Sequence, residues 1–429
     1  MAEKLKIGLL GLGTVGSGVP LILEEHKEKI SQITGMDIEI SKALVRNEER
    51  MAYHAGRFNF ELVDDFDEIL NDDEIQIVVE LIGKIEPAKS YISKALENGK
   101  HVVTANKDLL AQYGSKLVSL AQGNHVDLYF EGSVAGGIPI LRTIANSLAA
   151  DSIQKVYGIV NGTTNYMLTQ MISESKSYDD ALKEAQELGF AESDPTNDVD
   201  GIDAAYKMVI LSQFAFGMNI TVDQVEIKGI RDISVDDVKM AQNLGYEIKL
   251  IGSSELCDDS ISVEVSPMFI PKTHPLATVR NESNAVYINS QGVGNSMYYG
   301  PGAGAKPTAT SVVSDIITIA KNIKMGTVGH RFNAFKFQTK ITKDNSVFSK
   351  YYFSVELPDV YGQMLQLAKI FTESGVSFEQ IVQHKSEKEN ARIIIITHSA
   401  SKCQIKRVVY ELSNTDGFKV LSQYKVFGE

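Results

Sequence analysis

The residues KIGLLGLGTVG, at positions 6–16, decide the fold class of this chain. A short apolar strand runs into the glycine pattern Gly11-x-Gly13-x-x-Gly16, and a helical pattern follows. In such a turn the first glycine permits the tight bend, the second lets a pyrophosphate approach the backbone, and the third lets the helix pack on the strand. The start of the helix attracts the anion. The pattern predicts a dinucleotide site, against the alternative of a purely structural turn.

The following residues continue an alternation of strands and helices. Strand-like runs at 38–45, 77–81, 101–104 and 127–130 alternate with helical patterns at 15–30, 87–98 and 109–121. This alternation indicates a parallel sheet with helices on its faces. From about residue 136 the pattern becomes α+β, and a helix at about 308–322 is expected to return to the first domain.

We therefore predict an α/β protein in several parts. A Rossmann-type nucleotide-binding domain is expected at 1–135 plus about 305–325, and an α+β catalytic and dimerisation domain at 136–304. A linker is expected at 326–349. Residues 350–429 show the order βαββαβ, which is typical of a ferredoxin-like domain.

Composition narrows the class of partner. The 429 residues carry 42 Lys+Arg against 55 Asp+Glu, a net charge of −13, which argues against nonspecific binding to nucleic acid or to an anionic membrane. No stretch approaches the roughly 20 apolar residues of a membrane helix. Cys257 and Cys403 lie far apart, so neither a disulfide framework nor a structural zinc site is expected, and a reducing cytoplasm fits best.

The end of the second expected strand bears on the choice of cofactor. An acidic residue there would hold a ribose 2′-hydroxyl, whereas an arginine would accept a 2′-phosphate. This chain has Leu44-Val45-Arg46-Asn47. Arg46 favours NADP, with NAD tolerated, although an arginine simply exposed on a loop explains the pattern equally well.

Two lysines are candidates for proton transfer. Lys107 follows a strand at its carboxyl end, where open α/β sheets bind ligands; a solvated surface lysine is the alternative. Lys207 lies four residues after Asp203, on one face of the expected helix. A capped helix start with a routine ion pair explains that spacing, and a carboxylate cluster for an ammonium group is the functional reading. The carboxylates crowded before Lys207 are Glu192, Asp194, Asp198, Asp200 and Asp203.

Two further segments are rich in glycine. Residues 131–139 join the first two domains, and residues 161–165 follow a strand. Backbone carbonyls of the first segment could bind a monovalent cation, but a plain tight turn accounts for it as well.

In their order, these segments resemble homoserine dehydrogenase. The matching segments span residues 7 to about 320, and the one at 184–207 is close to diagnostic. They are GLGTVG at 11–16, VVTANK at 102–107, EGSVAGGIPI at 131–140, NGTTNY at 161–166, EAQELGFAESDPTNDVDGIDAAYK at 184–207, HPLA at 274–277 and GPGAGAKPTA at 300–309.

The resemblance implies a role for each matching position. Lys107 and Lys207 would stand at the reacting hydroxyl, with Lys207 as the usual proton donor. Glu192 and Asp203 would hold the homoserine amino group, with Asp198 in support. Glu131, Val134, Gly136 and Ile138 would bind a monovalent cation such as sodium. The cofactor, NADP or NAD, would contact Gly11, Leu12, Gly13, Thr14, Val15, Gly16, Thr104, Lys107, Gly189 and Gly304.

The last 80 or so residues resemble an ACT domain, a regulatory module that binds amino acids. Its usual Asp-x-Pro-Gly motif is replaced by Asp359-Val-Tyr361-Gly362, so an amino-acid effector such as threonine is in doubt and dimerisation is the alternative role. Lys84 and Ala135 also depart from the family pattern. The resemblance implies a cytoplasmic homodimer or homotetramer in threonine and methionine biosynthesis.

The implied reaction interconverts L-aspartate 4-semialdehyde and L-homoserine. A rival, aspartate-semialdehyde dehydrogenase, needs a cysteine nucleophile, and neither cysteine lies in a glycine-rich context. A fused aspartate kinase would need a longer chain. A non-catalytic sensor of nucleotide and amino acid is the alternative from another class, and the pair of lysines beside the acidic run argues against it.

Overall fold

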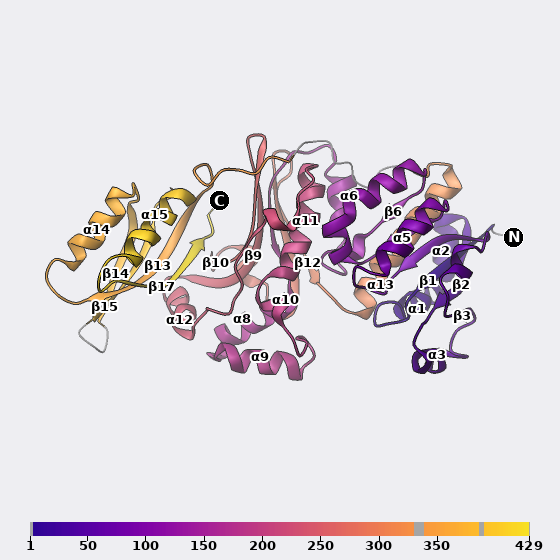
Figure 1. Ribbon diagram of the computed structural model, residues 1–429, viewed down its shortest axis with the longest axis horizontal. Coiled ribbons are helices and arrows are strands. Elements are labelled where there is room, and N and C mark those ends of the chain that lie inside the picture. The colour runs from indigo at the N-terminus through magenta and orange to yellow at the C-terminus, as the bar shows by residue number, and fades with distance from the viewer. Residues whose placement is uncertain (1–2, 330–338, 386–389, 429) are drawn as a thin grey trace. The chain divides into compact units, whose positions relative to one another are not determined.

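The computed structural model describes residues 3–329, 339–385 and 390–428. They form two compact units that interleave along the chain (Figure 1). The first unit comprises Met1–Val156, Tyr206–Gln224 and Ser283–Gln338. The second comprises Tyr157–Ala205, Val225–Glu282 and Thr339–Glu429.

The first unit is built on a six-stranded parallel sheet in the order β3-β2-β1-β4-β5-β6. This is the doubly wound order, in which ligands bind at the carboxyl ends of the strands where the chain reverses its direction of travel, between β1 and β4. The strands are β1 (Glu3–Leu10), β2 (Met36–Leu44), β3 (Glu61–Val63), β4 (Ile75–Glu80), β5 (His101–Thr104) and β6 (Leu128–Tyr129).

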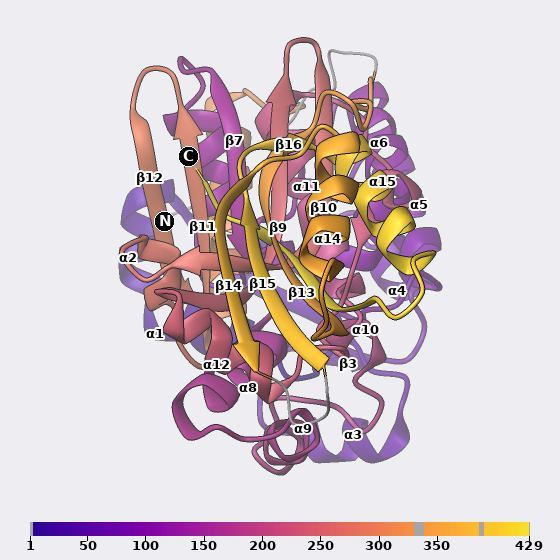
Figure 2. The same cartoon turned by 90° about the vertical axis from the view of Figure 1, so that its left-hand side faces the viewer.

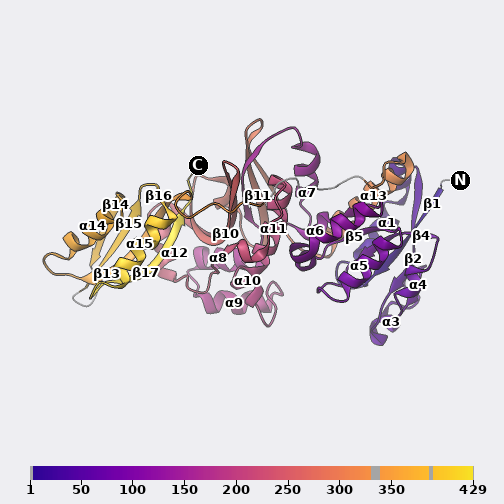
Figure 3. The same cartoon turned by 45° about the horizontal axis from the view of Figure 1, so that its top comes forward.

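Helices cover this sheet because its strands are apolar on both faces. In β1, Leu9 and Leu10 point to opposite faces and both are completely buried, and each such side chain contributes about 1.5–3 kcal/mol. Neighbours α5 and α6 pack together (Figure 3), while α13 packs on α1 and α2. The helices are α1 (Gly18–Glu25), α2 (Lys27–Thr34), α3 (Glu48–His54), α4 (Asp67–Leu70), α5 (Ala88–Glu97), α6 (Lys107–Gly123) and α13 (Ala305–Met325).

The helix expected at about 308–322 does return to this sheet. It is α13, and it begins at Ala305, inside the glycine-rich segment. The first unit also holds α7 (Ile140–Arg142) and the antiparallel hairpin of β11 (Ser283–Ser290) and β12 (Gly294–Pro301).

The second unit contains a run of strands in the order β9-β10-β17-β13-β15-β14. Its longest strands are β9 (Tyr246–Cys257) and β10 (Ser260–Pro271), which pair antiparallel over their whole lengths. Short β8 (Glu226–Ile227) also pairs with β10. The helices before them are α8 (Gly162–Glu174), α9 (Tyr178–Glu187), α10 (Thr196–Val199) and α12 (Val235–Asn243).

The C-terminal segment has the predicted βαββαβ order. Its sheet runs β17-β13-β15-β14, which is the fourth, first, third and second strand of the motif, with all neighbours antiparallel. Helices α14 and α15 cover one face (Figure 2), where Phe353, Phe371 and Val408 are buried together. The elements are β13 (Phe348–Pro358), α14 (Gln363–Glu373), β14 (Phe378–Lys385), β15 (Asn390–Thr397), α15 (Lys402–Ser413) and β17 (Lys419–Val426).

Some expectations were wrong in detail. The helical pattern at 15–30 is two helices that meet at His26. The exposed α3 and the glycine-containing β12 were not predicted, because neither has an apolar repeat. The expected linker at 326–349 is only partly irregular: Thr342 pairs with Ile261 of β10, and β13 already begins at Phe348. Residues 330–338 of that linker lie outside the described residues.

In the described parts of the chain, every helix is too short or too polar to cross a bilayer. In the same described residues, Cys257 and Cys403 lie outside any disulfide.

Candidate active site

The glycine loop of the first unit has the geometry that a dinucleotide needs. Gly11 has φ +96°, a left-handed conformation that favours glycine. A Cβ on Gly16 would lie 2.0 Å from the carbonyl oxygen of Gly11, so the close packing of helix start and strand requires glycine there. A Cβ on Gly13 would meet nothing within 4 Å. Gly13 therefore leaves open space above the backbone, where a pyrophosphate can approach.

A cavity of about 200 Å³ opens beside this loop. Its walls come from the carboxyl ends of β1, β2 and β4, the switch point of the sheet. Arg46 and Arg50 both line it. The side chain of Asn47, between them, caps α3 by accepting a hydrogen bond from the backbone N–H of Arg50. Arg46 was a candidate from the sequence, whereas Arg50 was not, although the capping residue Asn47 and the helical turn after it could have indicated Arg50.

Next to the cavity, a buried carboxylate fixes the strand ends. Glu80 accepts hydrogen bonds from the hydroxyl of Thr104 over 2.6 Å and from the backbone N–H of Ile82 over 2.8 Å. Burial raises the pKa of Glu80 above its ordinary value. The hydroxyl of Thr104 thus has a structural partner, whatever the residue also contributes to cofactor binding.

Lys107 stands at the carboxyl end of β5. It is the first residue of α6, half-buried, directly after the capping residue Asn106. Asn106 accepts from the backbone N–H of Leu109 and donates to the carbonyl of Lys84 over 2.6 Å. Lys207 belongs to α11 (Ile202–Phe216) and is buried, with 8% of its surface exposed. The backbone of both lysines is therefore held in a helix.

The expected cation segment forms one folded loop of the first unit. The buried carboxylate of Glu131 accepts the backbone N–H groups of Leu141 and Arg142 over 2.8 and 2.7 Å. The carbonyl of Gly136 accepts the hydroxyl of Ser311, and that of Ile138 accepts the N–H of Ile140. Val134 is fully buried. Carboxylate and carbonyl oxygens suit a hard cation, so the donor chemistry fits, but these oxygens also have protein partners.

In the second unit, one asparagine joins two members of the acidic run. Asn161 donates through Nδ2 to Oδ1 of Asp198 over 2.7 Å and to Oδ2 of Asp203 over 2.8 Å. Its Oδ1 accepts the N–H of Thr164 and so caps α8. The hydroxyl of Thr163 lies 3.3 Å from the other oxygen of Asp198. The motif at 161–165 thus serves this carboxylate pair, a role that sequence analysis did not assign.

The other acidic residues of the run lie in different surroundings. Asp194 accepts the N–H of Thr196, and Asp200 forms an ion pair with Arg231; both are local structural roles. Glu192 is exposed on the loop between α9 and α10, near Gly189, which has φ +78°. The spacing of the five carboxylates in the sequence does not distinguish them. The structure does, because their hydrogen-bond partners and their exposure differ.

A buried lysine of the second unit was not predicted from the sequence. Lys249 of β9 is completely buried, and its Nζ donates to the carbonyl of Val279 over 2.5 Å and to Oδ1 of Asn165 over 3.1 Å. Burial lowers its pKa to about 7, and the nearby Arg280 adds to this effect. Asn165 lies one helical turn after Asn161 on α8, so Lys249 anchors the helix that carries the carboxylate partner.

The parallel sheet, the glycine loop and its cavity define a dinucleotide-binding α/β protein of the Rossmann type. Residues 11–131 match the family model described as homoserine dehydrogenase, NAD binding domain, and residues 139–317 match the model for homoserine dehydrogenase. A homoserine dehydrogenase of Lactococcus lactis is 50% identical over 99% of this chain and 100% of the relative. The chain therefore belongs to the homoserine dehydrogenase family.

Solved structures agree with this assignment. The crystal structure of a homoserine dehydrogenase from Thiobacillus denitrificans matches with a TM-score of 0.93 and 36% identity, over 99% of this chain and 98% of that one. A hyperthermophilic archaeal homoserine dehydrogenase in complex with NADPH matches with a TM-score of 0.63 and 29% identity, over 74% of this chain and 97% of that one. Both family-model matches end before the C-terminal βαββαβ segment.

Proposed function

We propose that this chain interconverts L-aspartate 4-semialdehyde and L-homoserine with NADP or NAD, using its own lysines for proton transfer. The observation that carries the proposal is the pair of hydrogen bonds from Asn161 to Asp198 and Asp203 at the start of α11, the helix that also holds Lys207. Such a cluster gives an ammonium group a fixed negative partner beside a proton-carrying lysine.

In this proposal the first unit holds the cofactor at Gly11–Gly16. Gly13 admits the pyrophosphate, and Arg46 with Arg50 can accept a 2′-phosphate at the cavity edge. When bound, the nicotinamide supplies the hydride chemistry. Thr104, Lys107, Gly189 and Gly304 stay candidates for further contacts on the family resemblance.

The substrate's ammonium group would be held by Asp203 and Glu192, with Asp198 keeping Asp203 in place through Asn161. A buried carboxylate at a fixed angle restricts the orientation of the bound amino acid, which lowers the entropic part of the barrier. Lys207 and Lys107 would hydrogen-bond the reacting oxygen, and one of them would donate a proton to it. In the direction of homoserine oxidation the neutral lysine accepts the hydroxyl proton, so alkaline pH favours that direction.

Further elements of the proposal concern the domains and partners. Glu131, Val134, Gly136 and Ile138 would hold a monovalent cation that braces the loop at 131–140. The C-terminal βαββαβ segment would be an ACT-type domain whose loop at Asp359–Gly362 faces an amino-acid effector or a second subunit. We also propose a homodimer or homotetramer, and the division into three domains at 1–135 with about 305–325, at 136–304 and at 350–429. A cytoplasmic setting suits two cysteines that lie outside any disulfide.

The direct test is consumption of NADPH or NADH when aspartate 4-semialdehyde is added to the purified chain, with and without threonine. Turnover to homoserine supports the proposal. A non-catalytic sensor would bind nucleotide and amino acid and consume neither cofactor, which would overturn it.

A further inference from the structure

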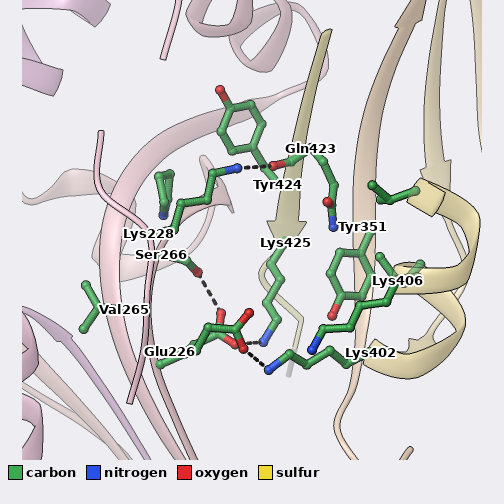
Figure 4. Close-up of a pocket in the computed structure, with 14 residues that line it drawn as sticks. Glu226, Lys228, Val265, Ser266, Tyr351, Lys402, Lys406, Gln423, Tyr424 and Lys425 are labelled. Atoms are coloured by element: carbon green, nitrogen blue, oxygen red, sulfur yellow. Dashed lines mark hydrogen bonds and ion pairs between the residues drawn. The ribbon is translucent and has the colours of Figure 1, made fainter. Parts of the chain in front are cut away.

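Glu80 is a buried carboxylate without a cationic partner. Its side chain is completely buried, and among the described residues it forms no ion pair and accepts hydrogen bonds from uncharged donors. Other buried carboxylates do face a cation, since a desolvated charge is costly to leave unpaired. Glu264 pairs with Lys425 in a cavity of about 290 Å³ within the second unit (Figure 4). In the first unit, Asp315 lies 2.6 Å from a guanidinium nitrogen of Arg142.

The place of Glu80 in the sheet connects two functional segments. It is the last residue of β4 and stands beside Leu10 of β1 and Thr104 of β5. Leu10 immediately precedes Gly11 of the glycine loop, and Thr104 comes three residues before Lys107. The carboxylate therefore lies between the segment that the proposed function assigns to the cofactor and the one that it assigns to proton transfer.

One oxygen of Glu80 serves the cofactor cavity. Oε1 accepts the backbone N–H of Ile82 over 2.8 Å and that of Gly83 over 3.1 Å. Ile82 lines the cavity of about 200 Å³ beside the glycine loop. Gly83 and Lys84 have φ of +75° and +62°, so the chain makes a left-handed turn here. The two hydrogen bonds hold that turn at the cavity wall.

The other oxygen serves the turn that leads to Lys107. Oε2 accepts the hydroxyl of Thr104 over 2.6 Å, and the same hydroxyl accepts the backbone N–H of Asn106 over 3.1 Å. Asn106 caps α6, whose first residue is Lys107. Its Nδ2 also donates to the carbonyl of Lys84 over 2.6 Å, which joins the two turns. A change at Glu80 therefore reaches the backbone of Lys107 through two hydrogen bonds and a helix cap.

We propose that Glu80 is a positioning residue for Lys107 and acts on it through Thr104 and Asn106. The proposal rests on the proposed function, in which Lys107 stands at the reacting oxygen. A lysine in that role must lie within hydrogen-bond reach of the oxygen, and a misplacement of about 1 Å can lower a rate about 100-fold. A carboxylate suits the task because both of its oxygens accept hydrogen bonds, whereas an amide offers one accepting oxygen.

A double-mutant cycle tests this route with Glu80→Gln, Thr104→Val and the variant that carries both. In Glu80→Gln the amide oxygen can still accept the N–H groups of Ile82 and Gly83. Its NH₂ group then faces Thr104, whose hydroxyl loses its acceptor. We expect kcat with NADPH and aspartate 4-semialdehyde to fall about 10–100-fold, while the Kd for NADPH from fluorescence titration stays nearly constant. Because both residues act by one route, the double variant should lose no more than the weaker single variant.

The reactivity of Lys107 supplies a second measurement, which needs no turnover. Competitive acetylation followed by mass spectrometry compares single lysines within one chain. Lys107 is half-buried at the start of α6, and Lys116 is exposed on the same helix. In Glu80→Gln we expect Lys107 to be acetylated faster, because the loosened turn exposes it, whereas the rate of Lys116 should stay the same.

Asp127→Asn is the matched control. Asp127 is also completely buried and accepts hydrogen bonds from Nδ2 of Asn322 and the N–H of Gly329, but it precedes β6, at the opposite edge of the same sheet. This variant should lose stability and keep the kcat and the Lys107 acetylation of the unchanged chain.

Four results would each overturn the proposal: unchanged kcat in Glu80→Gln, a loss of NADPH affinity as large as the loss of kcat, additive losses in the double variant, or the same effects in Asp127→Asn. If the unchanged chain fails to turn over, the proposed function is wrong. The acetylation rates still decide whether Glu80 positions Lys107.

Discussion

The side-chain nitrogen of Asn161 lies 2.8 Å from Oδ2 of Asp203 and donates a hydrogen bond to it. The opposite end of the amide is fixed, because Oδ1 of Asn161 accepts the N–H of Thr164 as the cap of α8. The orientation of the Asp203 carboxylate is thus fixed by the first turn of α8. This bond gives the acidic run a defined geometry that its spacing in the sequence does not.

Asn161→Asp should therefore damage substrate binding more than folding. Aspartate retains the capping oxygen, but it removes the donor and places a third carboxylate beside Asp198 and Asp203. We expect kcat/KM for homoserine to fall about 10–100-fold, the value of a hydrogen bond to a charged group, with KM for the cofactor unchanged. The same exchange at the exposed Asn345 is the control. Wild-type kcat/KM in Asn161→Asp would show that this contact is only structural.

Two alanine variants of the glycine loop should behave differently. Gly16→Ala places a Cβ 2.0 Å from the carbonyl oxygen of Gly11, and such overpacking costs about 1–3 kcal/mol, so its melting temperature should drop. Gly13→Ala meets no atom within 4 Å, so it should melt like the unchanged chain while its KM for the cofactor rises. Thermal unfolding and cofactor kinetics of both variants test these two expectations. An unchanged KM in Gly13→Ala would place the pyrophosphate elsewhere.

The two arginines of the cofactor cavity should govern selectivity for the 2′-phosphate. Arg46→Ala and Arg50→Ala should each raise KM for NADPH about tenfold, as expected for lost charge-assisted hydrogen bonds, and leave KM for NADH nearly constant. Arg57→Ala is the control, because Arg57 stacks 3.6 Å from the ring centre of Tyr53 and does not line the cavity. If the two variants raised KM for NADPH and for NADH equally, neither arginine would recognise the 2′-phosphate.

Lys249 should make stability depend on pH. Its pKa is about 7 in the folded chain, against an ordinary 10.5, so between these values the unfolded chain binds more protons. Stability from this group therefore rises with pH across that window, by at most about 1.4 kcal/mol per pH unit. Lys249→Met should remove this part of the slope in urea unfolding at pH 7 and 9.5, whereas the exposed Lys272→Met should not. If stability changed equally with pH in Lys249→Met and in the unchanged chain, the lowered pKa of Lys249 would be contradicted.

Patterns within short stretches of the sequence predicted the secondary structure and the order of its elements. The glycine spacing at 11–16 and the strand–helix alternation predicted the parallel sheet, and the βαββαβ order predicted the C-terminal sheet. The partners of the acidic run could not be predicted this way, because Asn161 is 37 and 42 residues from Asp198 and Asp203. Lys249 was missed for a related reason: a lysine in a strand normally indicates the solvent side, and only the fold buries it.

Two departures from the family pattern have a backbone explanation. Lys84 and Ala135 have φ of +62° and +52°, the left-handed region that costs a residue with a Cβ roughly 1–2 kcal/mol. Glycine would adopt these angles without that cost. The sequence showed the departures but not the strain.

The proposed mechanism depends on Lys207, the lysine that would donate a proton to the reacting oxygen. The turnover of Lys207→Ala with NADPH and aspartate 4-semialdehyde should be compared with that of the unchanged chain, after circular dichroism and cofactor titration show equal folding and equal NADPH affinity. We expect kcat to fall about 10²–10⁴-fold, the usual contribution of a positioned proton donor. Near-normal kcat in that variant would contradict the mechanism.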